Sequence, residues 1–109
     1  MKISTVLTKV YKLLEDKSHW TYGYSARDKW GHEVAIDSPK ACKFCVSGAF
    51  AYIHDKFNVN MNAPRSYFNN YIGINTTYGN MINLNDNHGY FKLMEVLKNC
   101  ISQARKERV

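Results

Sequence analysis

Residues 38–56 read SPKACKFCVSGAFAYIHDK, and this stretch decides the fold that we predict. Ser38 followed by Pro39 is a typical helix start, because serine caps the helix and proline fits its first position. Small and apolar side chains then recur at helical spacing and share one face: Ala41, Cys45, Gly48, Ala49, Tyr52 and Ile53. We therefore predict a helix over residues 39–56 as the central, most buried element.

Two further helices are predicted near the ends of the chain. Residues 3–17 and residues 88–106 each carry apolar side chains at helical spacing, which gives each segment one apolar stripe. Asn87 or Asp86 is the expected cap of the second of these helices. Such stripes are buried in a core far more often than they bind a partner, so we assign both to the core.

Between the predicted helices over residues 3–17 and 39–56, the spacing of apolar residues is no longer helical. Over residues 20–36, tyrosines alternate with smaller residues before a turn, and aliphatic residues alternate after it. Asp28 and Gly31 occupy the first and fourth positions of that turn, as type I turns prefer. These features predict a β-hairpin over residues 20–36.

Asparagine dominates the next segment. Residues 58–87 hold 10 of the 11 asparagines of the chain, and asparagine favours turns and caps. We predict mostly irregular structure here. The exceptions are a short helix over residues 64–71 capped by Asn62 and, as the alternative to a loop in the rest of the segment, a short strand around Met81 and Ile82. The expected fold is one α+β domain over residues 1–109, with three main helices packed with a hairpin.

Composition limits the classes of function. The chain has 109 residues and a net charge of +6, but 11 of its 15 cations are lysines scattered along the sequence. Dispersed lysine is a weaker indication of base recognition than clustered arginine, although it favours anionic ligands in general. No apolar run approaches the roughly 18 residues of a membrane span, so no membrane partner is expected. Three cysteines, an odd number, indicate a reducing compartment, and we expect a cytoplasmic protein.

Arg27 is the first candidate for a ligand-binding side chain. It is the only arginine in the first 64 residues, and Trp20, Tyr24 and Trp30 are among its neighbours in sequence. An arginine among aromatic residues forms either a structural cation–π pair or a platform for anions and bases. The neighbouring Asp28 is explained by turn geometry alone.

The cysteines give weaker signals. Cys42 and Cys45 form a C-x-x-C pair, but the flanking sequence lacks the βαβ pattern of redox proteins, and zinc would need two more ligands. We predict no metal and no cofactor. Cys45 as a nucleophile would need a base, for which His32 is the best placed, whereas its helical spacing favours a buried, inert thiol. We therefore favour a protein that is not an enzyme.

Several of these residues form a pattern: Trp20-x-x-Gly23-x-x-Ala26-Arg27-Asp28-x-x-Gly31, then Cys45-x-x-Gly48-Ala49, then Asn85-Asp86 before the last helix. The pattern resembles that of a family of small phage and bacterial proteins, a domain of unknown function. This resemblance implies a phage or mobile-element origin and an intracellular role, and it names no ligand. Family members often have tryptophan before the cysteine, where this chain has Phe44.

We expect the pattern to form one site where the hairpin meets the start of the second helix and the cap of the last. The predicted ligand-binding residues are Trp20, Tyr24, Arg27, Asp28, Trp30, Cys45, Asn85 and Asp86. We predict a phage-type accessory protein that binds a host protein or an anionic nucleotide-like ligand and counteracts a host defence. The alternatives are a sequence-tolerant DNA- or RNA-binding protein and a thiol-dependent enzyme that uses Cys45.

Overall fold

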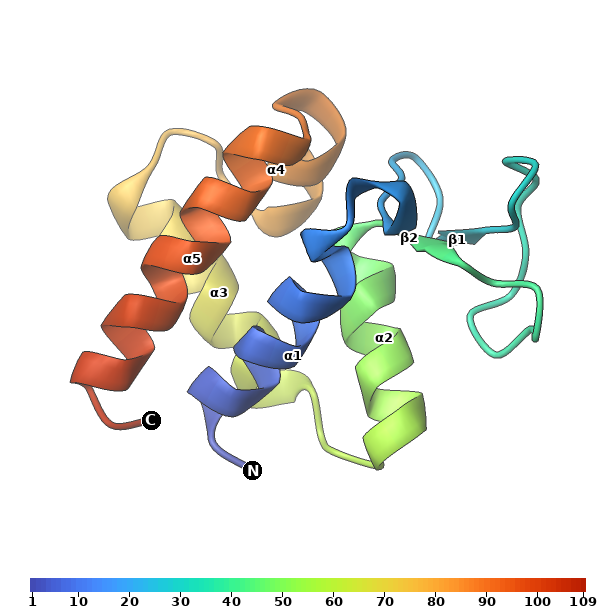
Figure 1. Cartoon of the computed structure of the whole chain (residues 1–109). Helices are drawn as coiled ribbons and strands as arrows, with labels where there is room; N and C mark the ends of the chain where they lie inside the picture. Colours follow the sequence, from blue (N-terminus) through green and yellow to red (C-terminus); the bar gives the residue numbers. More distant parts are fainter.

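Helix α1 (Ile3–Glu15) lies between α5 (Tyr90–Lys106) and α2 (Val46–Phe57) in the computed structural model, which describes residues 1–109 (Figure 1). Helix α1 also packs against the helix that follows α2 in sequence. The remaining elements are η1 (Lys17–His19), β1 (Ala26–Arg27), β2 (Lys43–Phe44), α3 (Asn62–Asn75) and α4 (Met81–Asn87). The prediction of a single α+β domain is confirmed, but five α-helices, not three, pack with the small sheet.

The apolar stripes meet in one core. From α1 the fully buried side chains are Val6, Leu7, Val10 and Leu14. From α5 they include Leu93, Leu97, Cys100 and Ala104. Burying each leucine stabilises the fold by about 2 kcal/mol, so these stripes act in packing, as their sequence pattern predicts. None of the helices combines the length and the apolar character needed to cross a membrane.

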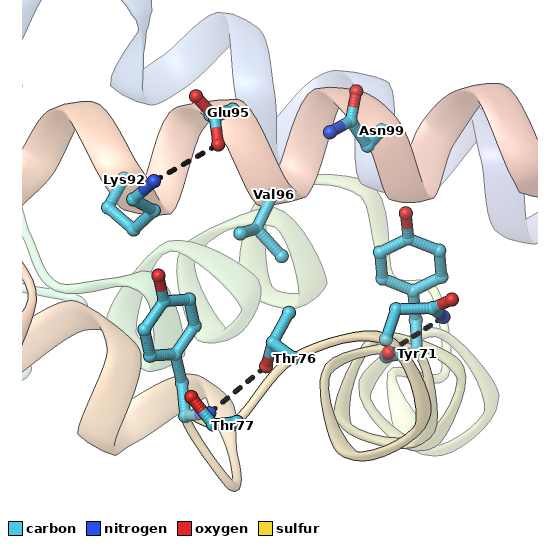
Figure 2. A pocket seen from close by; sticks show the side chains of 9 residues that line it. Tyr71, Thr76, Thr77, Lys92, Glu95, Val96 and Asn99 are labelled. Carbon is cyan, nitrogen blue, oxygen red and sulfur yellow. Dashed lines mark hydrogen bonds and ion pairs between the residues drawn. The ribbon is translucent and has the colours of Figure 1, made fainter.

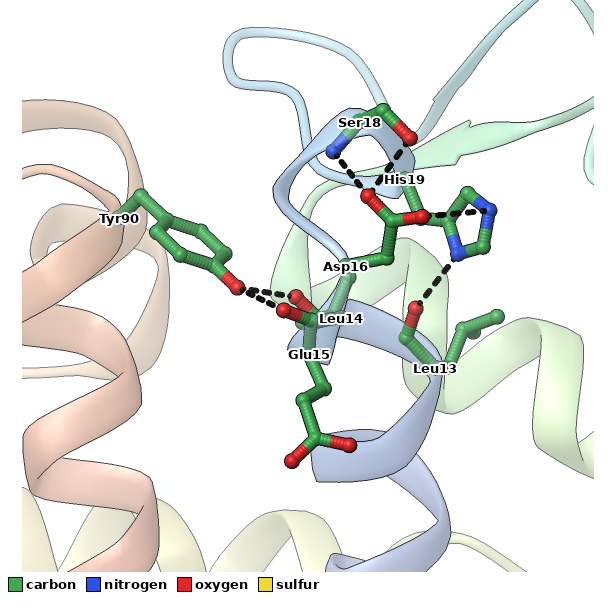
Figure 3. Close-up of polar contacts among 7 residues, drawn as sticks. All are labelled: Leu13, Leu14, Glu15, Asp16, Ser18, His19 and Tyr90. Carbon is green, nitrogen blue, oxygen red and sulfur yellow. Dashed lines mark hydrogen bonds and ion pairs between the residues drawn. The ribbon is translucent and has the colours of Figure 1, made fainter.

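The end of α1 is fixed by hydrogen bonds (Figure 3). The Tyr90 hydroxyl lies 2.6 Å from the Leu14 carbonyl oxygen and 2.7 Å from that of Glu15, and it shares its proton between them. Asp16 Oδ1 accepts from the Ser18 amide at 2.9 Å and from its hydroxyl at 2.7 Å. The last carbonyls of a helix lack partners within it, so Tyr90 satisfies two of them and ties α5 to the turn that leads to the site.

Helix α2 begins later than the sequence predicts. The start at Pro39 is wrong: the helix begins at Val46, with Cys45 as its N-cap. Ser38 instead forms a local turn, in which its hydroxyl oxygen accepts a hydrogen bond from the Lys40 amide. The chain then becomes extended because Phe44 buries its ring and joins the sheet.

The hairpin is shorter than predicted. The turn itself is confirmed, since the Gly31 amide donates to the Asp28 carbonyl at 3.0 Å. Pairing across this turn ends at Val34, whose amide donates to the Ala26 carbonyl. The other edge of β1 pairs antiparallel with β2, so that Ala26 faces Phe44, and the rest of residues 20–36 forms a loop.

The asparagine-rich segment is helical, so the prediction of irregular structure is wrong. Phe68, Ile72 and Leu84 are fully buried, and this apolar burial outweighs the low helix propensity of the asparagines between them. The predicted short helix over residues 64–71 lies inside α3, and the alternative strand at Met81 is absent because α4 begins there.

Asparagine side chains act at the ends of these helices. Asn80 caps α4, accepting a hydrogen bond from the Asn83 amide at 2.9 Å, and Asn58 ends α2 in the left-handed conformation. The expected cap of α5 is wrong: Gly89 occupies that position, while Asn87 and Asp86 belong to α4. This places Asp86 on a separate short helix that faces the start of α2.

Candidate functional site

Asn85 joins three separate segments of the chain. Its Oδ1 accepts hydrogen bonds from Trp20 Nε1 at 2.8 Å and from the Val46 amide at 2.9 Å. Its Nδ2 donates to the Thr21 carbonyl at 3.1 Å and to Asp86 Oδ1 at 2.9 Å. The side chain is 1% exposed, and all of its hydrogen-bonding capacity is used inside the protein. Asn85 therefore builds the site and offers no polar atom to a ligand.

Beside Asn85 lies a pocket of about 190 Å³, which we call the motif pocket. It is lined by Gly23, Tyr24, Ser25, Cys45, Val46, Ser47, Ile82, Asn85 and Asp86. Four of the eight predicted site residues line it: Tyr24, Cys45, Asn85 and Asp86. The loop before β1, the start of α2 and helix α4 each supply one side.

Asp86 is the one charged side chain in the motif pocket. Its Oδ1 accepts from the Gly23 amide at 3.2 Å and from Asn85 Nδ2 at 2.9 Å. Its Oδ2 accepts no hydrogen bond from the protein, and Asp86 takes part in none of the ion pairs. The carboxylate is thus held by one oxygen and offers the other as an acceptor.

Arg27 does not line the motif pocket but holds part of it. Its guanidinium donates to the Gly31 carbonyl at 2.7 Å and to the Tyr22 carbonyl at 3.2 Å. The same group lies 4.4 Å from the centroid of the Tyr24 ring. The geometry favours the structural cation–π alternative, in which Arg27 closes the loop and positions Tyr24.

Three other predicted residues lie outside the pocket. Asp28 Oδ1 accepts hydrogen bonds from the Trp30 and His32 amides, each at 2.9 Å. Desolvation raises the pKa of Asp28, but these hydrogen bonds outweigh it and lower the pKa below its ordinary value. Trp30 is 67% exposed at the loop tip, with the Lys29 ammonium 4.5 Å from its ring centroid. Trp20 packs behind the pocket through its bond to Asn85.

Cys45 acts as the N-cap of α2, since its Sγ accepts a hydrogen bond from the Gly48 amide at 3.3 Å. Burial raises the pKa of the Cys45 thiol, because desolvation outweighs the hydrogen bond from Gly48. The nearby Asp86 carboxylate raises this pKa further. His32, the proposed base, instead lies 3.6 Å from the Asp28 carboxylate. The geometry therefore gives Cys45 no activating histidine, and no group of side chains is arranged to hold a metal ion.

Gly48 explains another position of the sequence pattern. A Cβ atom on Gly48 would lie 1.9 Å from the Ser25 carbonyl oxygen. The same oxygen accepts a hydrogen bond from the Cys45 amide at 3.3 Å. Only glycine lets the loop lie directly on the first turn of α2, and this approach forms one wall of the motif pocket.

Sequence reasoning missed several pocket residues. Gly23 and Ser47 lie within the pattern itself, so the spacing around Trp20 and Cys45 could have indicated them. Ile82 precedes Asp86 by four residues on α4, but that helix was not predicted, and no sequence signal identified Ile82. Ser25 enters through its backbone contact with the start of α2.

A second pocket, of about 310 Å³, lies between α5 and the turn that follows α3 (Figure 2). Tyr71, Thr76 and Val96 are among its lining residues. Its only cation, Lys92, lies 3.2 Å from the Glu95 carboxylate, so the two charges satisfy each other. The pocket contains no residue of the sequence pattern.

Comparison of the chain with protein-family models, curated proteins and solved structures found no match, so the functional interpretation depends on geometry.

Proposed function

We propose that this chain is a small, non-enzymatic binding protein of phage or mobile-element type that acts in the cytoplasm. Its ligand is a flat group with adjacent N–H donors, bound in the motif pocket. The observation that carries the proposal is Asp86 Oδ2, an acceptor without a protein partner on the wall of a 190 Å³ pocket. A carboxylate oxygen has room for two donors, which a guanidine-type group supplies.

Tyr24 supports the flat shape of the ligand. Its ring is 46% exposed, lines the same pocket as Asp86, and is held in place by the Arg27 guanidinium. Aromatic rings stack on planar groups, whether a nucleobase or a guanidinium. A ring beside a carboxylate therefore selects for planarity and for N–H donors together.

Two sources carry this chemistry: the Watson–Crick edge of a guanine nucleotide and an arginine side chain of a host protein. The net charge of +6 attracts an anionic nucleotide and repels a basic partner, so the nucleotide is the source that we propose. By sequestering such a nucleotide-like signal, the protein would counteract a host defence. The negative charge of Asp86 lies in the motif pocket, where it contacts the N–H donors of the nucleobase and not the phosphate.

Isothermal titration with GMP, AMP and N1-methyl-GMP tests the proposal, and an arginine-containing peptide tests the other source. GMP should bind, whereas AMP and the methylated nucleotide, which lack the donor at N1, should bind at least about tenfold more weakly. If none of these ligands binds at millimolar concentration, the proposal is wrong. If the peptide binds more tightly than GMP, the ligand of the motif pocket is an arginine side chain of a protein partner and not a nucleotide.

Asp86→Asn tests the role of the carboxylate without changing its shape. The asparagine oxygen must accept from the Gly23 amide, so its NH₂ group would face the ligand and would replace an acceptor with a donor. GMP affinity should fall at least about tenfold. Asp37→Asn is the matched control, since it removes the same charge from an exposed site outside the pocket and should leave binding unchanged. Equal affinity in both variants would contradict the proposal.

A further inference from the structure

A second polar groove lies on the α1 side of the molecule, away from the motif pocket. It has a volume of about 250 Å³. Its lining residues are Ser4, Thr5, Thr8, Lys9, Lys12 and Arg105. The groove, which we call the basic groove, is thus lined by three cationic and three hydroxyl side chains, with no acidic and no apolar side chain. Such a set matches the oxygens of a phosphate group.

The helix geometry explains how the groove forms. Thr8 and Lys12 are spaced by four residues and therefore lie on one side of α1. Arg105 comes from the last turn of α5, which packs alongside α1, and its Nη2 lies 3.4 Å from Thr8 Oγ1. The Ser4 amide and hydroxyl donate to the Val109 backbone oxygen, and the Thr8 hydroxyl donates to the Ser4 carbonyl at 2.7 Å. The Thr5 hydroxyl and the three cations are therefore the donors that remain for a ligand.

The basic groove continues onto an exposed aromatic ring. Lys9 Nζ, which belongs to the groove, lies 4.2 Å from the centroid of Phe57 at the end of α2. Lys56 Nζ lies 5.7 Å from the same centroid, and the Phe57 side chain is 39% exposed. Cations next to an accessible aromatic ring are the groups with which proteins bind a phosphate backbone and stack a base.

We propose that the basic groove and Phe57 together bind single-stranded nucleic acid. None of the cations Lys9, Lys12, Lys56 and Arg105 takes part in an ion pair, although Asp55 adjoins Lys56 in sequence. A duplex would keep its bases stacked away from Phe57. The groove residues include no aliphatic side chain that could enter a lipid surface. This site is separate from the motif pocket and does not depend on the function proposed for it.

Fluorescence anisotropy with a labelled 12-nucleotide oligothymidylate tests the proposal over a range of salt concentrations. Thymine lacks the paired donor edge of guanine, so the motif pocket should not contribute. The double variant Lys9→Gln/Lys12→Gln should bind at least about tenfold more weakly, and its salt slope should fall by about 1.4. Lys29→Gln/Lys40→Gln removes the same charge from loops elsewhere and should change affinity by less than about twofold. Equal losses in the two variants would overturn the proposal.

Phe57→Leu tests stacking separately from charge. Leucine keeps an apolar side chain but removes the ring, so oligothymidylate affinity should fall at least about fivefold. Phe91→Leu is the matched control, because Phe91 is also an exposed aromatic residue but lies outside the groove, and its loss should have no effect. Equal binding of a duplex of the same length, or tighter binding of phosphatidylserine vesicles, would contradict a single-stranded nucleic acid as the ligand.

Discussion

The indole Nε1 of Trp20 donates a hydrogen bond to Asn85 Oδ1 at 2.8 Å, across 65 residues of sequence. Both residues belong to the pattern that suggested a functional site. The same Asn85 oxygen accepts from the Val46 amide, so one side chain aligns the loop, α4 and the start of α2. These two pattern residues are architectural, and they fix the carboxylate of the neighbouring Asp86 in the motif pocket.

Asn85→Leu should therefore destabilise the fold by about 3 kcal/mol, because it leaves buried polar groups of Trp20, Val46 and Thr21 without their partner. Urea unfolding followed by circular dichroism measures this loss. Asn99→Ala serves as the control: Asn99 is exposed on α5, and its side chain makes no hydrogen bond within the protein. Its change should be within about 0.5 kcal/mol. Similar unfolding midpoints for the two variants would contradict the structural role of Asn85.

A pair of glycine substitutions tests the packing of the loop on α2. Gly48→Ala places a methyl group against the Ser25 carbonyl oxygen and should cost about 2 kcal/mol or more. Gly73→Ala in α3 meets nothing closer than 3.9 Å and should stabilise by about 0.5–1 kcal/mol. Thermal unfolding of both variants gives the comparison. A stable Gly48→Ala variant would mean that the loop can move away from the helix.

The sequence predicted best where one physical term dominates. The stripes of α1 and α5 are governed by burial, and both helices formed within the predicted ranges. The start of α2 depends on a choice that local propensity does not show. Ser38 and Pro39 favour a helix start, but Phe44 is in the sheet, where it pairs with Ala26. The helix therefore begins only after Cys45, which is its N-cap. The pairing of residues 26–27 with 43–44 is nonlocal and leaves no periodic signal in so short a strand.

For the site, the pattern contains residues that line one pocket, but it did not indicate the structural role of each side chain. Its residues come from three segments, and four of them line the motif pocket: Gly23, Cys45, Asn85 and Asp86. The pattern could not show that the Arg27 guanidinium donates its hydrogen bonds to the Gly31 and Tyr22 carbonyls. The direction of a long side chain depends on backbone groups that only the folded loop positions. The basic groove was missed because its lysines are dispersed in sequence and gather only through helix packing.

Asp28 predicts a pH dependence of stability. Hydrogen bonds from His32 and Trp30 hold its pKa below the ordinary value despite desolvation. A carboxylate with a lowered folded-state pKa stabilises the fold above its unfolded pKa, and this contribution is lost as pH falls through the lowered value. Asp28→Asn should thus be less stable than the wild type at pH 7, and the difference should shrink below about pH 4. Urea midpoints at pH 7, 5 and 3 test this, and a constant difference would contradict it.

Cys45 provides the test of the thiol-enzyme alternative. Burial raises the pKa of its thiol, so little thiolate forms at neutral pH, and the sulfur accepts a hydrogen bond from the Gly48 amide. In a Cys42→Ser/Cys100→Ala background, iodoacetamide at pH 7.5 should modify folded Cys45 at least about tenfold more slowly than the same chain in urea. Mass spectrometry over time gives both rates.

Substitution of the same residue separates capping from reactivity. Serine is a preferred N-cap, so Cys45→Ser should retain the hydrogen bond from the Gly48 amide and should be at least as stable as the wild type. A slowly reacting thiol together with a stable serine variant would show that the role of Cys45 is to cap the start of α2. Alkylation of the folded protein as fast as that of free glutathione would reverse this conclusion, since it would show a thiolate that burial and Asp86 both oppose.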